Sequence, residues 1–189
     1  QPDDRVLVQL PNVAELVVLY YALSKLGAIV SPVPVQYGAH ELQSLAAALA
    51  ARHLVSMPRL REQALADTAR AALPGVTVLE FGKQLQIDTL AGAACQGVGD
   101  DANRILSICW TSGTTGTPKG VPRSHNMWIA TGRTSITAGS MCSDDVLLNP
   151  FPLVNMAALG GFLFPSAILG ATLVLHHPLD PALFLGQLQ

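Results

Sequence analysis

The sequence predicts an α/β domain layered around a largely parallel β-sheet. Two observations carry this prediction. Short runs rich in valine, isoleucine and leucine alternate with longer alanine- and leucine-rich runs of helical length, an alternation typical of strand–helix–strand units. Proline, glycine and capping residues separate most of these runs. The length of 189 residues fits one domain of ordinary size or a piece of a larger one.

The chain is expected to begin with a strand over residues 5–10 and a helix over residues 13–26. Asn12 and Glu15 are spaced almost as in a capping box, so Asn12 is the predicted N-cap of that helix. An extended segment follows over residues 28–35, and its prolines favour a place at an edge or rim of the sheet.

The remaining elements are predicted from the same alternation. Further strands are expected over residues 53–56, 75–81, 104–110, 145–148 and 171–176, and further helices over residues 40–51, 59–73, 124–138 and 156–169 and from 181 onward. Ser124 and Asp180 are the predicted N-caps of two of these helices, and Pro181 suits the first helical position after Asp180.

Charged residues are scarce in this chain. They make up 13% of it, half of the residues are hydrophobic, and the mean hydropathy is +0.38, whereas charged residues usually approach a quarter of a soluble domain. We therefore expect apolar surface meant for a missing remainder of the same polypeptide, and self-association without it. The net charge of −2 and the lack of a Lys/Arg cluster argue against a nucleic-acid partner.

Two further features bear on location. Residues 146–179 contain no Asp, Glu, Lys or Arg and are long enough to cross a bilayer, but prolines and glycines interrupt them. We expect a buried loop, helix and strand there rather than a membrane span. The three cysteines are an odd number without metal-ligand spacing, and no signal peptide is visible, so free thiols in a cytoplasmic protein are expected.

The residues that point most directly to chemistry are Thr111-Ser112-Gly113-Thr114-Thr115-Gly116-Thr117-Pro118-Lys119-Gly120. They follow the predicted strand over residues 104–110. The glycines let backbone N–H groups converge on a ligand, the hydroxyls add donors, and Lys119 adds a positive charge, so polyphosphate is the ligand that fits. A surface turn without function is the alternative on composition alone. The loop is not a Walker A motif, because Pro118 replaces the glycine before the lysine.

The run TSGTTGTPKGV closely resembles the signature loop of the adenylate-forming (AMP-binding) superfamily, which includes acyl- and aryl-CoA synthetases. Residues 5–35 resemble the family's early strand–helix–strand segment, and His125-Asn126 resembles a pair that often follows its loop. Residues 149–161 sit where the family carries its acyl-pocket motif. The resemblance implies that residues 1–189 are part of the N-terminal, AMP-binding domain of an acyl-CoA synthetase-like fold, with the C-terminal domain absent.

The resemblance also implies what the loop does. The residues that would hold the β- and γ-phosphates of ATP and the leaving pyrophosphate are Thr111, Ser112, Gly113, Thr114, Thr115, Gly116, Thr117 and Lys119. Lys119 would be catalytic because it stabilises charge that develops on pyrophosphate. Thr111 would also be a contact for Mg²⁺. The implied enzyme is an ATP-dependent carboxylic acid–CoA ligase with CoA as co-substrate, and the isolated fragment is expected to be inactive.

The sequence departs from the family pattern at Asn155. The acyl-pocket motif commonly reads Pro-Leu-Phe-His, and here it reads Pro152-Leu153-Val154-Asn155. Asn155 is the candidate substrate-binding residue, at the mouth of a pocket for a small carboxylic acid. It is equally a candidate N-cap for the helix expected to begin near Met156.

Several alternatives stay open at this stage. The acceptor of the acyl group is either CoA or a carrier protein, and a non-catalytic nucleotide-binding module is the rival from a different class. His125 either touches substrate or the loop, or makes a structural hydrogen bond. His176 and His177 are interpreted as strand-end residues, because neighbours on a strand point to opposite faces and rarely share a metal ion.

Overall fold

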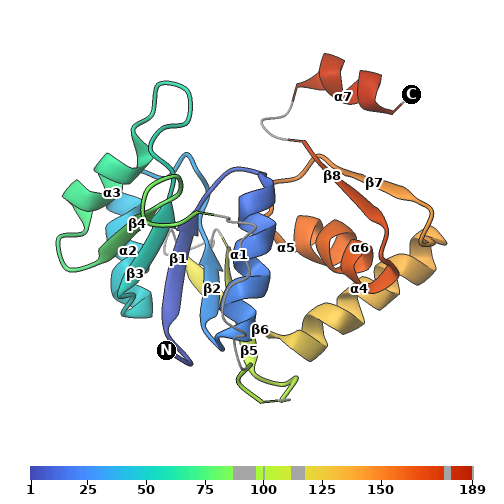
Figure 1. Ribbon diagram of the computed structural model, residues 1–189, viewed down its shortest axis with the longest axis horizontal. Helices are drawn as coiled ribbons and strands as arrows, with labels where there is room; N and C mark the ends of the chain where they lie inside the picture. Colours follow the sequence, from blue (N-terminus) through green and yellow to red (C-terminus); the bar gives the residue numbers. More distant parts are fainter. Residues whose placement is uncertain (87–96, 100, 112–117, 177–179, 189) are drawn as a thin grey trace.

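The computed structural model describes residues 1–86, 97–99, 101–111, 118–176 and 180–188 (Figure 1). The strands are β1 (Arg5–Gln9), β2 (Ile29–Pro32), β3 (His53–Ser56), β4 (Thr77–Glu80), β5 (Ile105–Thr111), β6 (Lys119–Ser124), β7 (Val146–Asn149) and β8 (Thr172–Leu175). The α-helices are α1 (Ala14–Lys25), α2 (Ala39–Leu49), α3 (Leu65–Ala72), α4 (His125–Gly139), α5 (Met156–Ala158), α6 (Phe164–Leu169) and α7 (Pro181–Gln187). A π-helical turn, Leu159–Leu163, joins α5 to α6.

The strands form a six-stranded sheet in the order β4-β3-β1-β2-β5-β6 and a two-stranded sheet, β7-β8. Every pair is parallel except β5-β6, so the predicted α/β fold with a largely parallel sheet is confirmed. Because β1 to β5 all run the same way, their carboxyl ends meet at one edge of the sheet. Ligands of open α/β sheets bind outside that edge.

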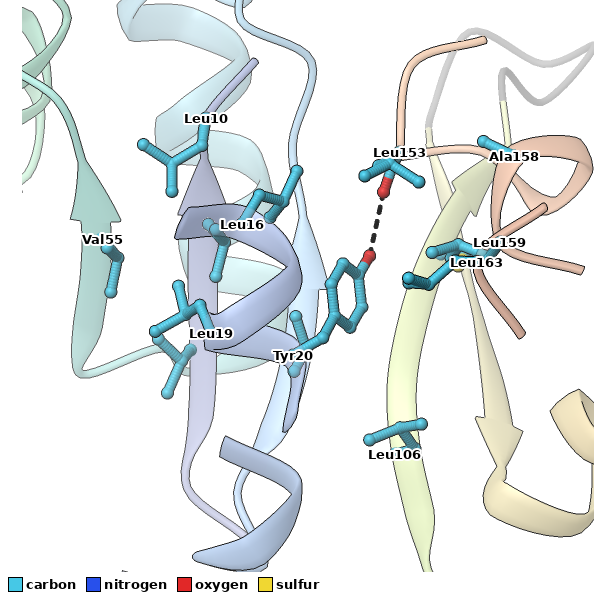
Figure 2. Packing of buried hydrophobic residues seen from close by; sticks show 14 of the residues in the cluster. Leu10, Leu16, Leu19, Tyr20, Val55, Leu106, Leu153, Ala158, Leu159 and Leu163 are labelled. Carbon is cyan, nitrogen blue, oxygen red and sulfur yellow. Dashed lines mark hydrogen bonds between the residues drawn. The ribbon is translucent and has the colours of Figure 1, made fainter. Parts of the chain in front are cut away.

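Two apolar layers hold the fold together, one on each face of the large sheet. One layer packs α1, α4 and the π-helical turn against β1, β2 and β5, and the other packs α2 and α3 against the opposite face. In the first layer, Leu16 and Leu19 of α1 pack against the sheet, and Tyr20 is directed toward Leu153 (Figure 2). Burying a leucine side chain fully stabilises the fold by roughly 1.5–3 kcal/mol.

Several predicted boundaries and caps are confirmed. The strand over residues 53–56 is β3. Ser124 caps α4 by accepting a hydrogen bond from the backbone N–H of Met127 at 3.3 Å. Asp180 caps α7 by accepting from the N–H groups of Ala182 and Leu183, both at 3.0 Å. Within the described ranges, no helix is long and apolar enough to cross a membrane.

Two predictions about the first segment are wrong. The N-cap of α1 is Val13, and no side chain caps it, because the amide of Asn12 is used for long-range contacts instead. The segment predicted at an edge or rim of the sheet contains β2, which is not an edge strand but lies between β1 and β5. The interior position tolerates Pro32 because this proline is the last residue of the strand, where the ladder loses a single donor.

Two elements differ from expectation farther along. The helix predicted over residues 59–73 begins only at Leu65, because Leu60 and Gln63 exchange backbone hydrogen bonds and Arg61 adopts a positive φ of 53°. The strand β6 was not expected, since its sequence contains Pro122 and few strand-forming residues. It forms the edge of the sheet, where a proline is tolerated.

Candidate functional site

The two described ends of the predicted phosphate loop lie side by side on a β-hairpin. Thr111 is the last residue of β5, Lys119 is the first residue of β6, and the two are register partners. The Thr111 Oγ1 atom donates to the Lys119 carbonyl at 3.4 Å, and both residues are exposed. The loop therefore leaves and re-enters the sheet at one point, with a hydroxyl and an ammonium group beside it.

The base of this hairpin is anchored in the sheet by two tryptophans. The indole N–H of Trp110 donates to Ser31 Oγ in β2 at 2.8 Å. On the opposite face, the indole N–H of Trp128 in α4 donates to Ser107 Oγ in β5 at 2.8 Å, and both partners are fully buried. These bonds connect β5 to β2 and to α4, so the position of Thr111 is determined by the core.

Gly120 allows the two hairpin strands to approach closely. A Cβ atom at this position would lie 2.9 Å from the Cγ2 atom of Ile108 and 3.3 Å from the Trp110 ring. A side-chain carbon at 2.9 Å would force the Ile108 side chain or one of the two strands to shift. Packing between β5 and β6 thus favours glycine after Lys119, independently of any contact with phosphate.

Asn155 lies on a separate segment, at the start of α5. Its Oδ1 atom accepts a hydrogen bond from the backbone N–H of Ala158 at 2.8 Å, so the predicted N-cap is confirmed. Asn155 also lines a cavity of about 230 Å³. The other walls are residues 10–12, which follow β1, residues 34–36, which follow β2, and Pro152 with Val154. The cap and a place in a pocket therefore coexist.

The side chains of Asn12 and Tyr20 hold the segment that leads to Asn155. Asn12 Oδ1 accepts from the Leu153 N–H at 2.7 Å, and its Nδ2 donates to the carbonyls of Phe151 at 2.8 Å and His176 at 3.3 Å. Tyr20 Oη donates to the Leu153 carbonyl at 3.0 Å (Figure 2). Sequence reasoning missed this role, because Asn12 also fits a local cap and nothing local identifies its distant partners.

These contacts bring the carboxyl ends of both sheets together. Asn12 follows β1, Phe151 follows β7, and His176 follows β8. Thr111 ends β5, which is parallel to β2 and so reaches the same edge of the large sheet. The cavity beside Asn155 and the hairpin that carries Lys119 therefore open on the carboxyl edge, where a ligand can contact several strand ends.

Other candidate residues lie away from this edge or inside the core. The register of β5 and β6 pairs Ser124 with Ile105, so His125 is six strand residues, roughly 20 Å, from Lys119. It lies beside Arg104, and burial and that guanidinium lower the pKa of His125. Cys109 lies in the core, and burial raises the pKa of its thiol.

In the part of the chain that the structure describes, no three His, Cys, Asp or Glu side chains are grouped to hold a metal ion. His176 makes structural contacts: its Nδ1 atom lies 2.6 Å from Gln187 Oε1, and its Nε2 atom accepts from the Asp180 N–H at 3.0 Å. His177 and the loop residues Ser112, Gly113, Thr114, Thr115, Gly116 and Thr117 lie outside the described residues.

The sheet and the hairpin at its carboxyl edge define an α/β protein with a loop of phosphate-binding composition. The family model described as AMP-binding enzyme matches residues 1–189. The chain therefore belongs to the AMP-binding enzyme family.

Curated relatives agree with this assignment. The chain is similar to the long-chain-fatty-acid–CoA ligase FadD13 of Mycobacterium tuberculosis, with 31% identity over 175 residues that cover 90% of this chain and 34% of the relative. It is similar to the indoleacetate–CoA ligase of Aromatoleum aromaticum, also with 31% identity, over 89% of this chain and 34% of the relative. The chain thus spans about a third of the length of these relatives.

Solved structures support the fold in the same way. The apo structure of MbtA from Mycobacterium smegmatis superposes with a TM-score of 0.85 and 28% identity, over 100% of this chain and 37% of that chain. ATP-bound MatB from Rhodopseudomonas palustris superposes with a TM-score of 0.81 and 27% identity, over 98% of this chain and 37% of that chain.

Proposed function

We propose that this chain is part of an ATP-dependent ligase that activates a carboxylic acid as its acyl-adenylate and then transfers the acyl group to CoA. The observation that carries the proposal is the pairing of Thr111 with Lys119 at the carboxyl edge. These residues flank the run that resembles the family's signature loop, which supports a role for the Thr111 hydroxyl and the Lys119 ammonium group in phosphate binding. The family membership and the CoA ligases among the relatives support the reaction class.

In this reaction a carboxylate oxygen of the acid attacks the α-phosphorus of ATP, and the bond between the α-phosphorus and the bridging oxygen breaks. Pyrophosphate leaves with dense negative charge. Lys119 stabilises that charge, and the hydroxyls and N–H groups of residues 111–117 donate to it. Lys119 is suited to this role because its backbone is fixed by β6 while its side chain is exposed.

The proposed reaction also involves Mg²⁺ and CoA. Mg²⁺ would neutralise phosphate charge, and we assign Thr111 as a residue near it because a hydroxyl oxygen is a suitable ligand and this one is exposed at the hairpin mouth. The thiol of CoA would attack the acyl carbonyl and release AMP. The CoA ligases among the relatives favour CoA over a carrier protein as acceptor.

The acid is assigned to the cavity that Asn155 lines. The Oδ1 atom of Asn155 is engaged as a cap, which leaves its Nδ2 donor for a carboxylate or another oxygen of the acid. The surrounding prolines, leucine and valines make most of the lining apolar, which suits a small acid with an apolar body.

Cys109 and Cys142 are free thiols, which supports a cytoplasmic location.

The test is acid-dependent exchange of pyrophosphate into ATP by the enzyme that contains this chain, measured against a panel of fatty, aromatic and amino acids. Exchange with at least one acid, followed by CoA-dependent release of AMP, is the expected result. No exchange with any acid, together with retained ATP binding, would favour a non-catalytic nucleotide-binding module. Exchange without CoA-dependent turnover would favour a carrier protein as acceptor.

A further inference from the structure

We propose that Asn12 and Tyr20 are positioning residues for the acid pocket: together they fasten the segment that carries Asn155 to the end of β1. This inference rests on the proposed function for its pocket, but the contacts that carry it are independent of any ligand. Tyr20 does not line the cavity, and Asn12, which does, uses its amide for contacts with the protein backbone. Each acts through the backbone of Leu153, two positions before Asn155.

The first observation is that both backbone polar groups of Leu153 are held by side chains from the beginning of the chain. Its N–H donates to Asn12 Oδ1 at 2.7 Å, and its carbonyl accepts from Tyr20 Oη at 3.0 Å. All three residues are buried, with exposed fractions of 6%, 3% and 0% for Asn12, Tyr20 and Leu153. Water cannot replace either bond without a rearrangement of the core.

The second observation is that both polar atoms of the Asn12 amide form hydrogen bonds within the protein. Its oxygen accepts from Leu153, and its nitrogen donates to the carbonyls of Phe151 and His176. Aspartate has almost the same shape but cannot donate, so it would place negative charge against two carbonyl oxygens. Asn12 therefore specifies one arrangement of the ends of β1, β7 and β8.

The tyrosine contributes a donor that does not depend on pH near neutrality. Burial raises the pKa of Tyr20 well above its ordinary range, so its hydroxyl stays protonated. The ring packs in the apolar layer beside Leu153 (Figure 2). Tyr20→Phe therefore removes one hydrogen bond while the ring that fills the core remains.

The opposite wall of the same cavity is fastened in a similar way. Gln9, the last residue of β1, is buried, and its Nε2 atom donates to the carbonyls of Pro34 at 3.3 Å, Val35 at 3.4 Å and Tyr37 at 2.8 Å. Two amide side chains near the end of β1 thus hold residues 34–37 and 151–153, the two segments that contain or adjoin the flanking wall residues. These contacts set the width of the pocket. Loss of one of these hydrogen bonds should therefore change the affinity of the pocket for an acid.

The test compares Tyr20→Phe with Tyr21→Phe, in which the adjacent, 42% exposed tyrosine loses its hydroxyl. Both are made in the enzyme that contains this chain, and pyrophosphate exchange and backbone amide exchange are measured. We expect Tyr20→Phe to raise the acid KM about three- to tenfold, the range of one lost hydrogen bond, with the ATP KM and kcat kept within about twofold. Amide exchange of residues 153–155 should accelerate, and Tyr21→Phe should change neither readout.

Asn12→Asp and Asn12→Ala provide a second measurement, with larger increases in the acid KM expected in both. A merely structural role would lower the active fraction and hence kcat without changing the acid KM. An unchanged acid KM in Tyr20→Phe would overturn the inference, even if amide exchange accelerates. If the parent enzyme activates no acid, the proposed function fails, and amide exchange alone decides whether Tyr20 holds the segment before Asn155. Faster exchange at residues 153–155 in Tyr20→Phe supports that role. Equal exchange in the variant and the parent overturns it.

Discussion

Thr111 and Lys119 are register partners at the loop end of the β5-β6 hairpin, with Thr111 Oγ1 3.4 Å from the Lys119 carbonyl. The lysine backbone therefore belongs to a strand, and its side chain is exposed. Because only the backbone of Lys119 takes part in the sheet, substitution of its side chain removes the positive charge without loss of a packing contact in the core.

The first prediction follows from this arrangement. Lys119→Ala should lower the rate of acid-dependent pyrophosphate exchange roughly a hundred- to a thousandfold, because one contact to developing negative charge is lost, and should leave the melting temperature almost unchanged. Exchange kinetics and thermal unfolding check the two halves. Lys25→Ala, at the exposed end of α1, is the matched control and should leave the exchange rate unchanged. Normal exchange in Lys119→Ala would remove this lysine from the mechanism.

The second prediction concerns Gly120. Gly120→Ala should destabilise the fold by about 1–3 kcal/mol, because its Cβ would overlap the Ile108 side chain, so that either this side chain or β6 has to shift. Gly75→Ala is the control, since a Cβ there meets no atom within 4 Å. Urea unfolding followed by circular dichroism gives both free energies of unfolding. Equal stability of the two variants would show that the hairpin relaxes freely.

The third prediction compares the two tryptophan hydrogen bonds. Ser107→Ala leaves the buried indole N–H of Trp128 without its acceptor and should cost about 1–3 kcal/mol in the free energy of unfolding. Ser31→Ala should cost less, because its partner Trp110 is only partly buried and water can reach it. Urea unfolding of both variants decides the order, and a larger loss in Ser31→Ala would contradict the assignment.

The fourth prediction concerns pH. The Glu80 carboxylate is 1% exposed and pairs with Lys83, at 2.6 Å, and with Arg70. These two cations lower the pKa of Glu80 in the folded protein. The stabilisation is therefore complete above the unfolded-state pKa of about 4.3 and is lost as the pH falls through the lower folded-state value.

Glu80→Gln should accordingly be less stable than the parent at neutral pH, and the difference should shrink as the pH falls below about 4. Thermal unfolding between neutral and acidic pH measures it. Glu62→Gln, at an exposed position, serves as the control and should follow the parent across the series. A stability difference that does not vary with pH would show that the loss comes from packing rather than from ionisation.

Local signals predicted much of this fold, and contacts distant in the sequence account for most of the errors. The caps Ser124 and Asp180 were predicted because a cap bonds to N–H groups two or three residues away. The strand β6 was missed because pairing with β5, not its own composition, makes it extended. Asn12 was misassigned because an amide serves equally well in a local cap and in contact with Leu153, 141 positions away.

In the candidate site, too, features contiguous in the sequence were predicted and features built from distant segments were not. The loop at residues 111–120 was predicted because its glycines, hydroxyls and lysine are contiguous in the sequence. A pocket beside Asn155 was expected only from the family resemblance, and its other walls could not be predicted because they come from separate strand ends. His125 follows the loop closely in the sequence, yet the antiparallel hairpin carries it to the opposite edge of the sheet.

The last prediction separates the two roles of Asn155. Asn155→Asp keeps an acceptor for the Ala158 N–H, so the cap and the stability should be retained. The variant places negative charge at the cavity, so it should raise the KM for the acid if a carboxylate binds there. Asn155→Ala loses both the cap and the donor, and should cost about 1 kcal/mol of stability as well as weaken acid binding.

Ser124→Ala is the matched control for the loss of a cap. Ser124 caps α4 at the opposite edge of the sheet, so this variant should lose stability by about 1 kcal/mol while the acid KM stays the same. Thermal unfolding and pyrophosphate exchange at varied acid concentration separate the two effects. If Asn155→Asp leaves the acid KM unchanged while Asn155→Ala and Ser124→Ala are equally destabilised, Asn155 is only a cap, and the acid must bind elsewhere along the carboxyl edge.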